Sequence, residues 1–261
     1  MEMGPVLDPR GKMRKLKISS IVCCLSLVSA GVARDSAPEW GRVASDVASY
    51  LALAVQNLES GQWQRANAYC ESILLGDEIT YCVIVRSDQP QAASRAIEAT
   101  QMGLAVWEQA LRPEVRFVRT DDLRSADIAL IFQPRVLSGG RQIAGKIRWQ
   151  RRVVERNGGY SPTFTADAHL SLMDPNSRAL SSRALAHSIA HEVGHALGLE
   201  ESNSAQGVMG PISPQGTGLF VSADDLRVLL ELRQRAAEIQ QQSLWSGFEP
   251  FGGYKPASEA L

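Results

Sequence analysis

The sequence has almost no net charge, which removes the electrostatic basis for binding nucleic acid. Its 27 basic and 28 acidic side chains give a formal charge of -1 at pH 7. Proteins that bind DNA or RNA through phosphate groups usually carry a clear excess of lysine and arginine. We therefore expect no nucleic-acid partner.

Long apolar runs are also lacking, apart from one near the N-terminus. Residues 18–33 contain no charged side chain, follow a basic cluster at positions 12–17, and end in Gly-Val-Ala. This pattern is typical of a secretory signal peptide, and the run is short for a transmembrane helix. We interpret residues 1–33 as a signal and expect a secreted protein, extracellular or periplasmic, without stable membrane insertion after signal removal. Lipidation at Cys23 or Cys24 is the alternative.

Cysteine is scarce, and only Cys70 and Cys82 follow the signal. In an oxidising compartment, two thiols twelve positions apart pair most simply with each other. We therefore predict a disulfide between Cys70 and Cys82.

Histidine is equally rare, yet two of the four histidines lie in His-Glu-Val-Gly-His-Ala-Leu-Gly-Leu-Glu-Glu, residues 191–201. Residues four apart on a helix share one face, so the imidazoles of His191 and His195 can bind one metal ion. Glu192 is placed to accept a proton from a water molecule at that metal. Gly198 can adopt a left-handed conformation and turn the chain back, which brings Glu200 and Glu201 towards the same ion. Three protein ligands and one open position form a catalytic zinc site.

The remaining pattern predicts an α/β (α+β) domain. Strands separated by one long helix indicate a twisted mixed sheet with helices packed on it, and the arginine-rich strand at 143–154 is expected at a sheet edge. Gly158, Gly159 and Pro162 predict a loop. The expected helices cover residues 40–60, 63–75, 92–111, 182–197 and 222–234, and the expected strands cover 79–85, 115–118, 126–132, 143–154 and 166–173.

The same pattern divides the mature chain into three parts. Residues 34–75 form a helical N-terminal segment, which is either a pro-segment or a cover packed on the next domain. Residues 76–236 form the catalytic domain. Residues 237–261 are polar with scattered aromatic side chains and are expected to form a C-terminal tail.

The metal motif resembles that of the metzincin zinc peptidases, in which HExxHxxG and a third ligand are followed by a methionine in a loop. Met209 follows Glu201 by eight positions within Gly-Val-Met-Gly-Pro, and the same interval occurs in matrixins. The resemblance covers most of residues 76–235. It implies a metzincin-like zincin fold, with a long helix, an active-site helix, a Met-turn and a C-terminal helix.

The resemblance also implies the roles of the site residues. His191, His195 and Glu201 would bind zinc, Glu192 would be the general base, and Met209 would form an apolar floor beneath the metal. Matrixins usually have histidine where this chain has Glu201, so Glu200 or a water molecule remains an alternative as the third ligand. For Cys70 and Cys82, the alternative to a disulfide is that one of them blocks the zinc, as in latent matrix metalloproteinases, but the Pro-Arg-Cys-Gly motif of those enzymes is absent. His187 is expected to be packed, and His169 to be structural or to line the cleft.

These observations predict a secreted, zinc-dependent endopeptidase that hydrolyses protein or peptide substrates and is a monomer. The alternative is a catalytically weak relative, a zinc-stabilised protein-binding module of the same fold. Glu192 argues against that alternative, because a binding module needs no base at this position. A zinc hydrolase that acts on a non-peptide amide is a third possibility.

Overall fold

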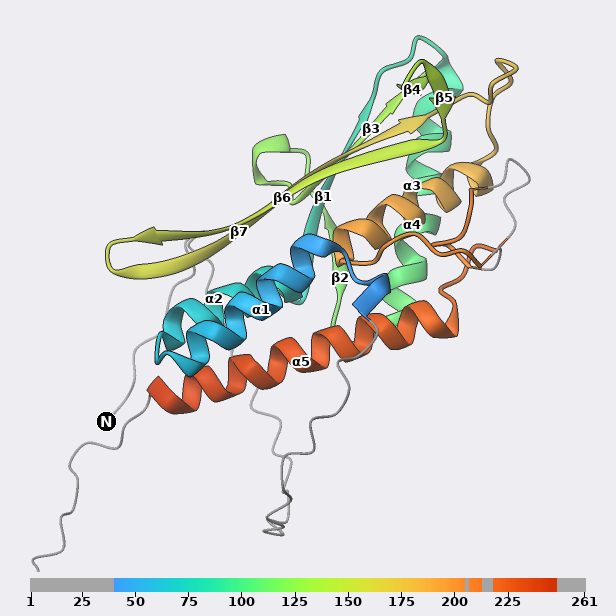
Figure 1. Ribbon diagram of the computed structural model, residues 1–261. Coiled ribbons are helices and arrows are strands. Elements are labelled where there is room, and N and C mark those ends of the chain that lie inside the picture. Colours follow the sequence, from blue (N-terminus) through green and yellow to red (C-terminus); the bar gives the residue numbers. More distant parts are fainter. Residues whose placement is uncertain (1–39, 205–206, 213–217, 248–261) are drawn as a thin grey trace, which may run out of the picture. The chain divides into compact units, whose positions relative to one another are not determined.

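Five strands form one mixed sheet in the order β2-β1-β3-β7-β6 in a computed structural model, which describes residues 40–204, 207–212 and 218–247. Strands β2, β1, β3 and β7 run parallel to one another, and β6 is an edge strand that pairs antiparallel with β7 (Figure 1). The mixed sheet is therefore confirmed, and so is the edge position of the arginine-rich segment, except that the edge strand begins at Gly145 and Ile143 belongs to β5. The strands are β1 Glu78–Val85, β2 Arg116–Arg119, β3 Ile128–Gln133, β6 Gly145–Arg156 and β7 Gly159–Ser171, and β4 Val136–Ser138 pairs with β5 Arg141–Ile143 in a separate hairpin.

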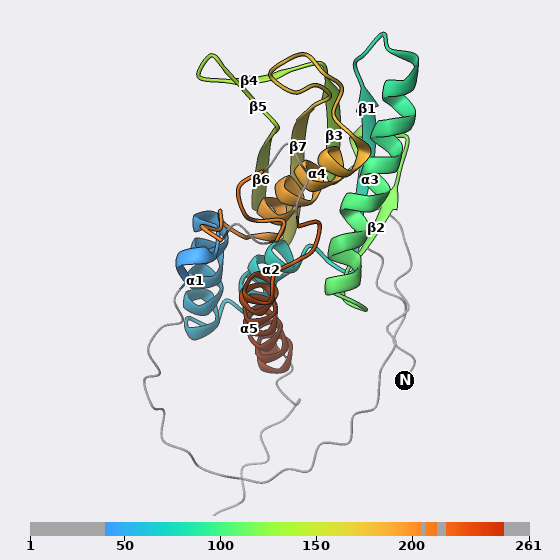
Figure 2. The same cartoon turned by 90° about the vertical axis from the view of Figure 1, so that its right-hand side faces the viewer.

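The two central helices, α3 and α4, pack side by side on one face of the sheet (Figure 2). Alternate residues of β1, β3 and β7 are buried in the same core as the apolar sides of these helices, including Ile79, Leu130 and Leu170. This follows from the two-residue period of a strand, which directs every second side chain to one face. The helices are α1 Ser45–Glu59, α2 Trp63–Leu74, α3 Pro90–Ala110, α4 Ser182–Leu197 and α5 Ala223–Gly247, and the short 3-10 helices are η1 Trp40–Arg42 and η2 Leu123–Ser125.

The N-terminal helices belong to the same core as the sheet. Helices α1 and α2 pack on each other, α2 packs on α5 and β7, and Val47, Leu51 and Ile73 lie in the common core. The predicted signal at 1–33 lies outside the described residues. No helix in the described ranges is long and apolar enough to cross a membrane.

Strand β7 begins seven residues earlier than expected, at Gly159. Asn157 and Gly158 both have positive φ, 52° and 74°, so they form a two-residue turn whose twist suits a hairpin. Pro162 lies opposite Val153, at a position whose missing N–H would point away from β6, so proline is tolerated there. The predicted loop is therefore the end of a long hairpin.

Helix α5 continues to Gly247, well beyond the end expected near residue 234. Its polar second half has a buried stripe at helical spacing, formed by Ala236, Ile239 and Ser243. Arg233 is anchored by Glu114 and by the carbonyl of Leu74. The expected tail therefore begins with a packed helix.

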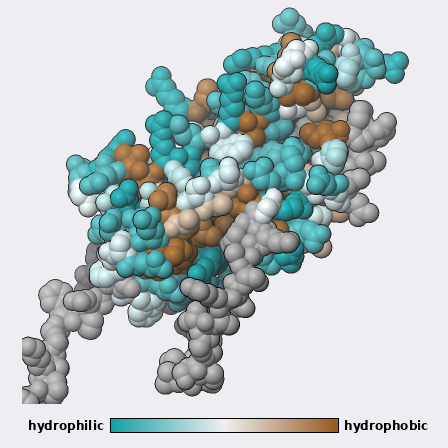
Figure 3. Space-filling view, viewed as in Figure 1, coloured by the Kyte–Doolittle hydropathy of each residue, from teal (hydrophilic) through white to brown (hydrophobic). Residues whose placement is uncertain are grey.

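On the face viewed in Figure 3, hydrophilic side chains predominate and the apolar ones form separate patches.

The predicted disulfide is wrong, because Cys70 and Cys82 are both buried free thiols. Cys82 follows Tyr81 in β1, so its side chain points to the opposite face of the sheet. Cys70 lies in α2 within the core to which Tyr81 belongs. Burial raises the pKa of the Cys70 thiol to about 12. That thiol is protonated at neutral pH and is a poor metal ligand.

Candidate metal centre

Both histidines of the motif project from the buried helix α4, which begins at the Ser181 cap. Nδ1 of His191 lies 2.8 Å from the carbonyl oxygen of Val208, and Nδ1 of His195 lies 2.8 Å from that of Leu199. A carbonyl only accepts, so each Nδ1 carries the proton and donates it. Each Nε2 therefore keeps its lone pair for a metal ion, the arrangement found when a backbone carbonyl orients a ligating histidine.

Glu201 completes a three-residue donor set. Its Oε1 lies 3.3 Å from Nε2 of His191 and 3.4 Å from Nε2 of His195. Ligands about 2.0–2.1 Å from a tetrahedral zinc ion are separated by roughly 3.3–3.4 Å, so these spacings fit zinc. Within the described ranges, no other set of three such side chains comes together. Glu200 lines the surrounding cleft but is not part of this set.

The turn that carries Glu201 is held from two sides. Gly198 is left-handed, with φ 108°, and its N–H donates to the carbonyls of Gly194 and His195. Leu199 then forms an antiparallel bridge with Val43. On the other side, the N–H of Ser202 donates to the carbonyl of Met209 at 2.8 Å. The turn that carries Glu201 is thus supported by the N-terminal segment at Val43 and by the segment at Met209.

Met209 is fully buried next to Gly194 and Trp107. A Cβ atom at Gly194 would lie 2.1 Å from the sulfur of Met209 and 2.8 Å from the Trp107 ring. Trp107 donates from its indole N–H to the carbonyl of Ala190 at 2.7 Å. Helix α4 therefore packs on Trp107 and Met209 between its two motif histidines, and only glycine leaves room for this packing.

Glu192 lies beside the ligands and is 4% exposed. In the metal-free protein, burial raises its pKa to about 8, and the charge of Glu201 adds to this effect, while a hydrogen bond from the N–H of Ile147 acts in the opposite direction. A Cβ atom at Gly145 would lie 2.5 Å from its carboxylate oxygen. Because Gly145 at the start of β6 has no side chain, the Glu192 carboxylate can lie beside the sheet edge.

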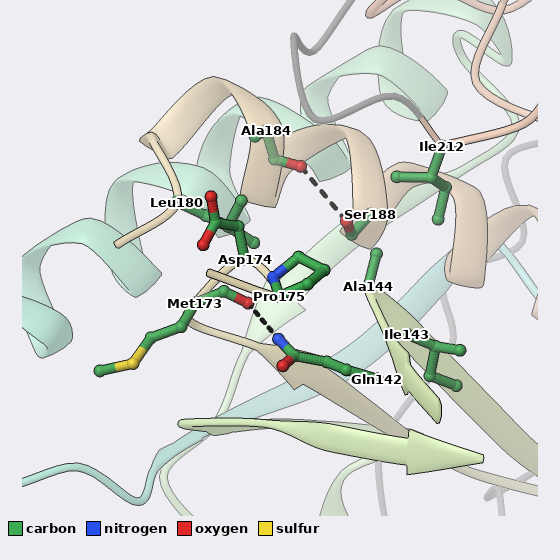
Figure 4. Close-up of a pocket in the computed structure, with 10 residues that line it drawn as sticks. All are labelled: Gln142, Ile143, Ala144, Met173, Asp174, Pro175, Leu180, Ala184, Ser188 and Ile212. Atoms are coloured by element: carbon green, nitrogen blue, oxygen red, sulfur yellow. Dashed lines mark hydrogen bonds between the residues drawn. The ribbon is translucent and has the colours of Figure 1, made fainter. Parts of the chain in front are cut away.

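The donor set opens into a cleft of about 690 Å³ between β6 and the segment after Met209, lined by Gly145, Ile147, Trp149, Glu200, Pro211 and Ile212 among others. The Trp149 ring lies nearly parallel to that of His195, with centroids 6.3 Å apart. A second cavity of about 180 Å³ adjoins the cleft, and the two share Gln142, Ile143, Ala144 and Ile212 (Figure 4).

Two polar side chains of the second cavity are bound to the protein itself. Ser188 donates to the carbonyl of Ala184 at 3.2 Å, and Gln142 donates to that of Met173 at 2.7 Å (Figure 4). The remaining lining is largely apolar and includes Ile143, Leu180 and Ile212. The cavity therefore suits an apolar group.

The other two histidines lie outside the donor set. His187 is 1% exposed and lies one turn before His191 on α4. His169 is in β7 between Ala168 and Leu170, whose side chains lie in the core, so it points to the opposite face of the sheet. Sequence patterns did not identify Trp149, whose role depends on a contact between β6 and α4.

A protein-family model described as matrixin, a peptidase family, matches residues 74–233. The match includes His191, Glu192, His195, Glu201 and Met209, and it begins at the last residue of α2. Among solved structures, archaemetzincin from Methanopyrus kandleri is similar at 15% sequence identity and a TM-score of 0.39. That similarity covers 60% of this chain and 96% of the archaeal one.

Proposed function

The chain belongs to the matrixin family of zinc peptidases, and on this basis we propose that it is a secreted endopeptidase with Glu192 as its general base. The observation that carries the proposal is the buried carboxylate of Glu192 beside three converging donor atoms. The run at residues 18–33 supports secretion.

His191, His195 and Glu201 would hold the zinc ion in this proposal. When bound, zinc supplies Lewis acidity, which polarises a peptide carbonyl and makes a water molecule easier to deprotonate. Because the third donor is a carboxylate, the net positive charge at the site is lower than with three histidines. We therefore expect a somewhat weaker effect on the acidity of water than in a site with three histidines.

Glu192 would accept a proton from the attacking water and transfer it to the leaving amine. Its burial favours this role, because a general base works best when its pKa lies near the working pH. The N–H of Ile147 restricts the orientation of its carboxylate. Gly145 leaves the space in which that carboxylate lies.

The substrate would bind as an additional strand on the free edge of β6, where backbone hydrogen bonds provide affinity without strict sequence preference. Strand β6 is an outer strand of the sheet and lines the cleft from Gly145 to Trp149. The adjoining cavity of about 180 Å³ would accept an apolar side chain next to the cleaved bond.

The test is to measure zinc content and cleavage of a mixed peptide library by the mature chain and by Glu192→Gln. We expect both proteins to bind one zinc ion and only the wild type to cleave. Glu200→Gln is the matched control, since Glu200 lines the cleft but is not in the donor set. If the zinc-loaded wild type shows no Glu192-dependent cleavage, the peptidase proposal fails in favour of the zinc-stabilised binding module.

A further inference from the structure

The hairpin turn determines which backbone groups of β6 face away from the sheet. A two-residue turn at Asn157 and Gly158 makes Arg156 and Gly159 a hydrogen-bonded pair. Pairs alternate along an antiparallel ladder, so the odd-numbered residues of β6 direct both N–H and C=O to the free edge. The N–H of Ile147 and the C=O of Arg151 accordingly bind partners outside the sheet.

Helix α1 occupies this free edge at one end. The hydroxyl of Tyr50 donates to the carbonyl of Arg151 at 2.7 Å. Asp46, one turn earlier, accepts from the indole N–H of Trp149 at 2.8 Å and from the guanidinium of Arg151 at 2.7 Å. Neither Tyr50 nor Asp46 lines the cleft, which ends at Trp149 on this side.

The same helix is anchored to the metal-binding helix. Buried Arg151 binds Asp46 and also donates to the carbonyl of Ala196, near the end of α4. Trp149, held by Asp46, stacks on His195. Arg42, just before α1, accepts from the N–H of Glu200 through its carbonyl at 2.9 Å and forms an ion pair with fully buried Asp225. Helix α1 is therefore fixed to both the cleft and the third-ligand turn.

We infer that helix α1 is the end wall of the substrate groove and limits how many substrate residues can pair with β6. The inference depends on the proposed peptidase function, because it concerns the side of the cleaved bond that faces Trp149. Gly145, Ile147 and Trp149 line the cleft, and the N–H of Ile147 there is bound to Glu192. The carbonyl of Arg151, beyond the cleft, is occupied by Tyr50.

A substrate that runs antiparallel to β6, as β7 does on the other side, directs its N-terminal end towards this wall. Glu192 touches the edge at Gly145 and Ile147, so the cleaved bond lies near these residues. Adding a residue before that bond should raise affinity until the chain reaches Trp149. This leaves room for roughly three residues, since edge groups recur every second residue. Substrate residues beyond the third leave the groove and should not raise affinity further.

The wall is tested with peptides that share one cleavage site and carry one to six residues before it. For the wild type, kcat/KM should rise to about the third residue and then stay constant. In Tyr50→Ala, which frees the Arg151 carbonyl, the next residues should raise kcat/KM by a further three- to tenfold, roughly the effect of one hydrogen bond. Ser49→Ala, on the exposed side of the same helix, should keep the wild-type profile.

Peptide hydroxamates of one to six residues provide a measurement that does not require cleavage. Their terminal group binds zinc, and Kd should fall to the third residue and then remain constant. A wild-type profile that keeps improving to the sixth residue, or a Tyr50→Ala profile equal to the wild-type one, overturns the end wall. A plateau in Kd without cleavage of any peptide supports the wall and overturns the peptidase proposal.

Discussion

The sulfur of Met209 occupies the space that a side chain at Gly194 would need. A Cβ atom there would lie 2.1 Å from that sulfur, far inside van der Waals contact. Gly194, between His191 and His195, has no side chain, and helix α4 can therefore pack directly against Met209.

Gly194→Ala should destabilise the protein and weaken zinc binding. Alanine is favoured over glycine in a helix by about 1 kcal/mol, but overpacking at a fully buried site costs typically about 1–3 kcal/mol. The steric effect should dominate here, because the Trp107 ring also lies 2.8 Å from the new atom. Urea unfolding and competition with a zinc chelator measure the two effects. Gly41→Ala is the control, since nothing lies within 4 Å of its Cβ position, and equal stability of both variants would contradict the prediction.

Gly145→Ala should lower kcat while zinc remains bound. The new methyl group would meet the carboxylate of Glu192 at 2.5 Å and displace it, whereas the three donor atoms would stay in place. A displacement of about 1 Å in a catalytic group can reduce the rate on the order of a hundredfold. Gly159→Ala, at the other end of the hairpin, meets only a backbone oxygen at 3.8 Å and serves as control. Unchanged turnover in Gly145→Ala would show that the base does not depend on this contact.

Glu201→Ala should reduce zinc affinity by at least tenfold, whereas Glu200→Ala should leave it nearly unchanged. The carboxylate of Glu201 lies 3.3 Å and 3.4 Å from the two imidazole nitrogens, and Glu200 is not in the donor set. Glu201→His should retain zinc binding, because it restores the residue that matrixins usually carry at this position. Titration with a fluorescent chelator gives the three affinities. Full affinity in Glu201→Ala would remove Glu201 from the ligand set.

The metal-free protein should lose stability as the pH rises from about 4.5 to 8. The pKa of Glu192 is raised from 4.5 to about 8 in the folded state. The protonated carboxyl therefore makes its full contribution to the free energy of unfolding below about pH 4.5. That effect disappears as the folded carboxyl ionises, and by linkage it amounts to about 5 kcal/mol at most. Glu192→Gln should show a flatter dependence, measured by urea unfolding in excess chelator at several pH values. Parallel curves for wild type and variant would contradict this.

The local geometry of the metal site could be predicted because it depends on short-range rules. The helix period places His191 and His195 on one face, and Gly198 adopts the left-handed turn that brings Glu201 back. The early start of β7 could also have been found, since Asn157-Gly158 is a strong hairpin signal.

Contacts between distant segments could not be predicted in the same way. Asp46 and Trp149 are 103 positions apart, and no local pattern specifies their hydrogen bond. The disulfide prediction failed for a related reason. Spacing along the chain does not show that Cys82 faces away from the core in which Cys70 lies.

The bridge between Val43 and Leu199 has a practical consequence for any shortened form of this protein. The family match begins at residue 74, and a gene trimmed to that boundary would encode all three side chains of the donor set. It would omit Val43, the bridge partner of Leu199, the Asp46 carboxylate that accepts from Trp149, and the Arg42 guanidinium that pairs with buried Asp225. We therefore expect the smallest stable unit to be longer than the region shared with the family and to start no later than Arg42.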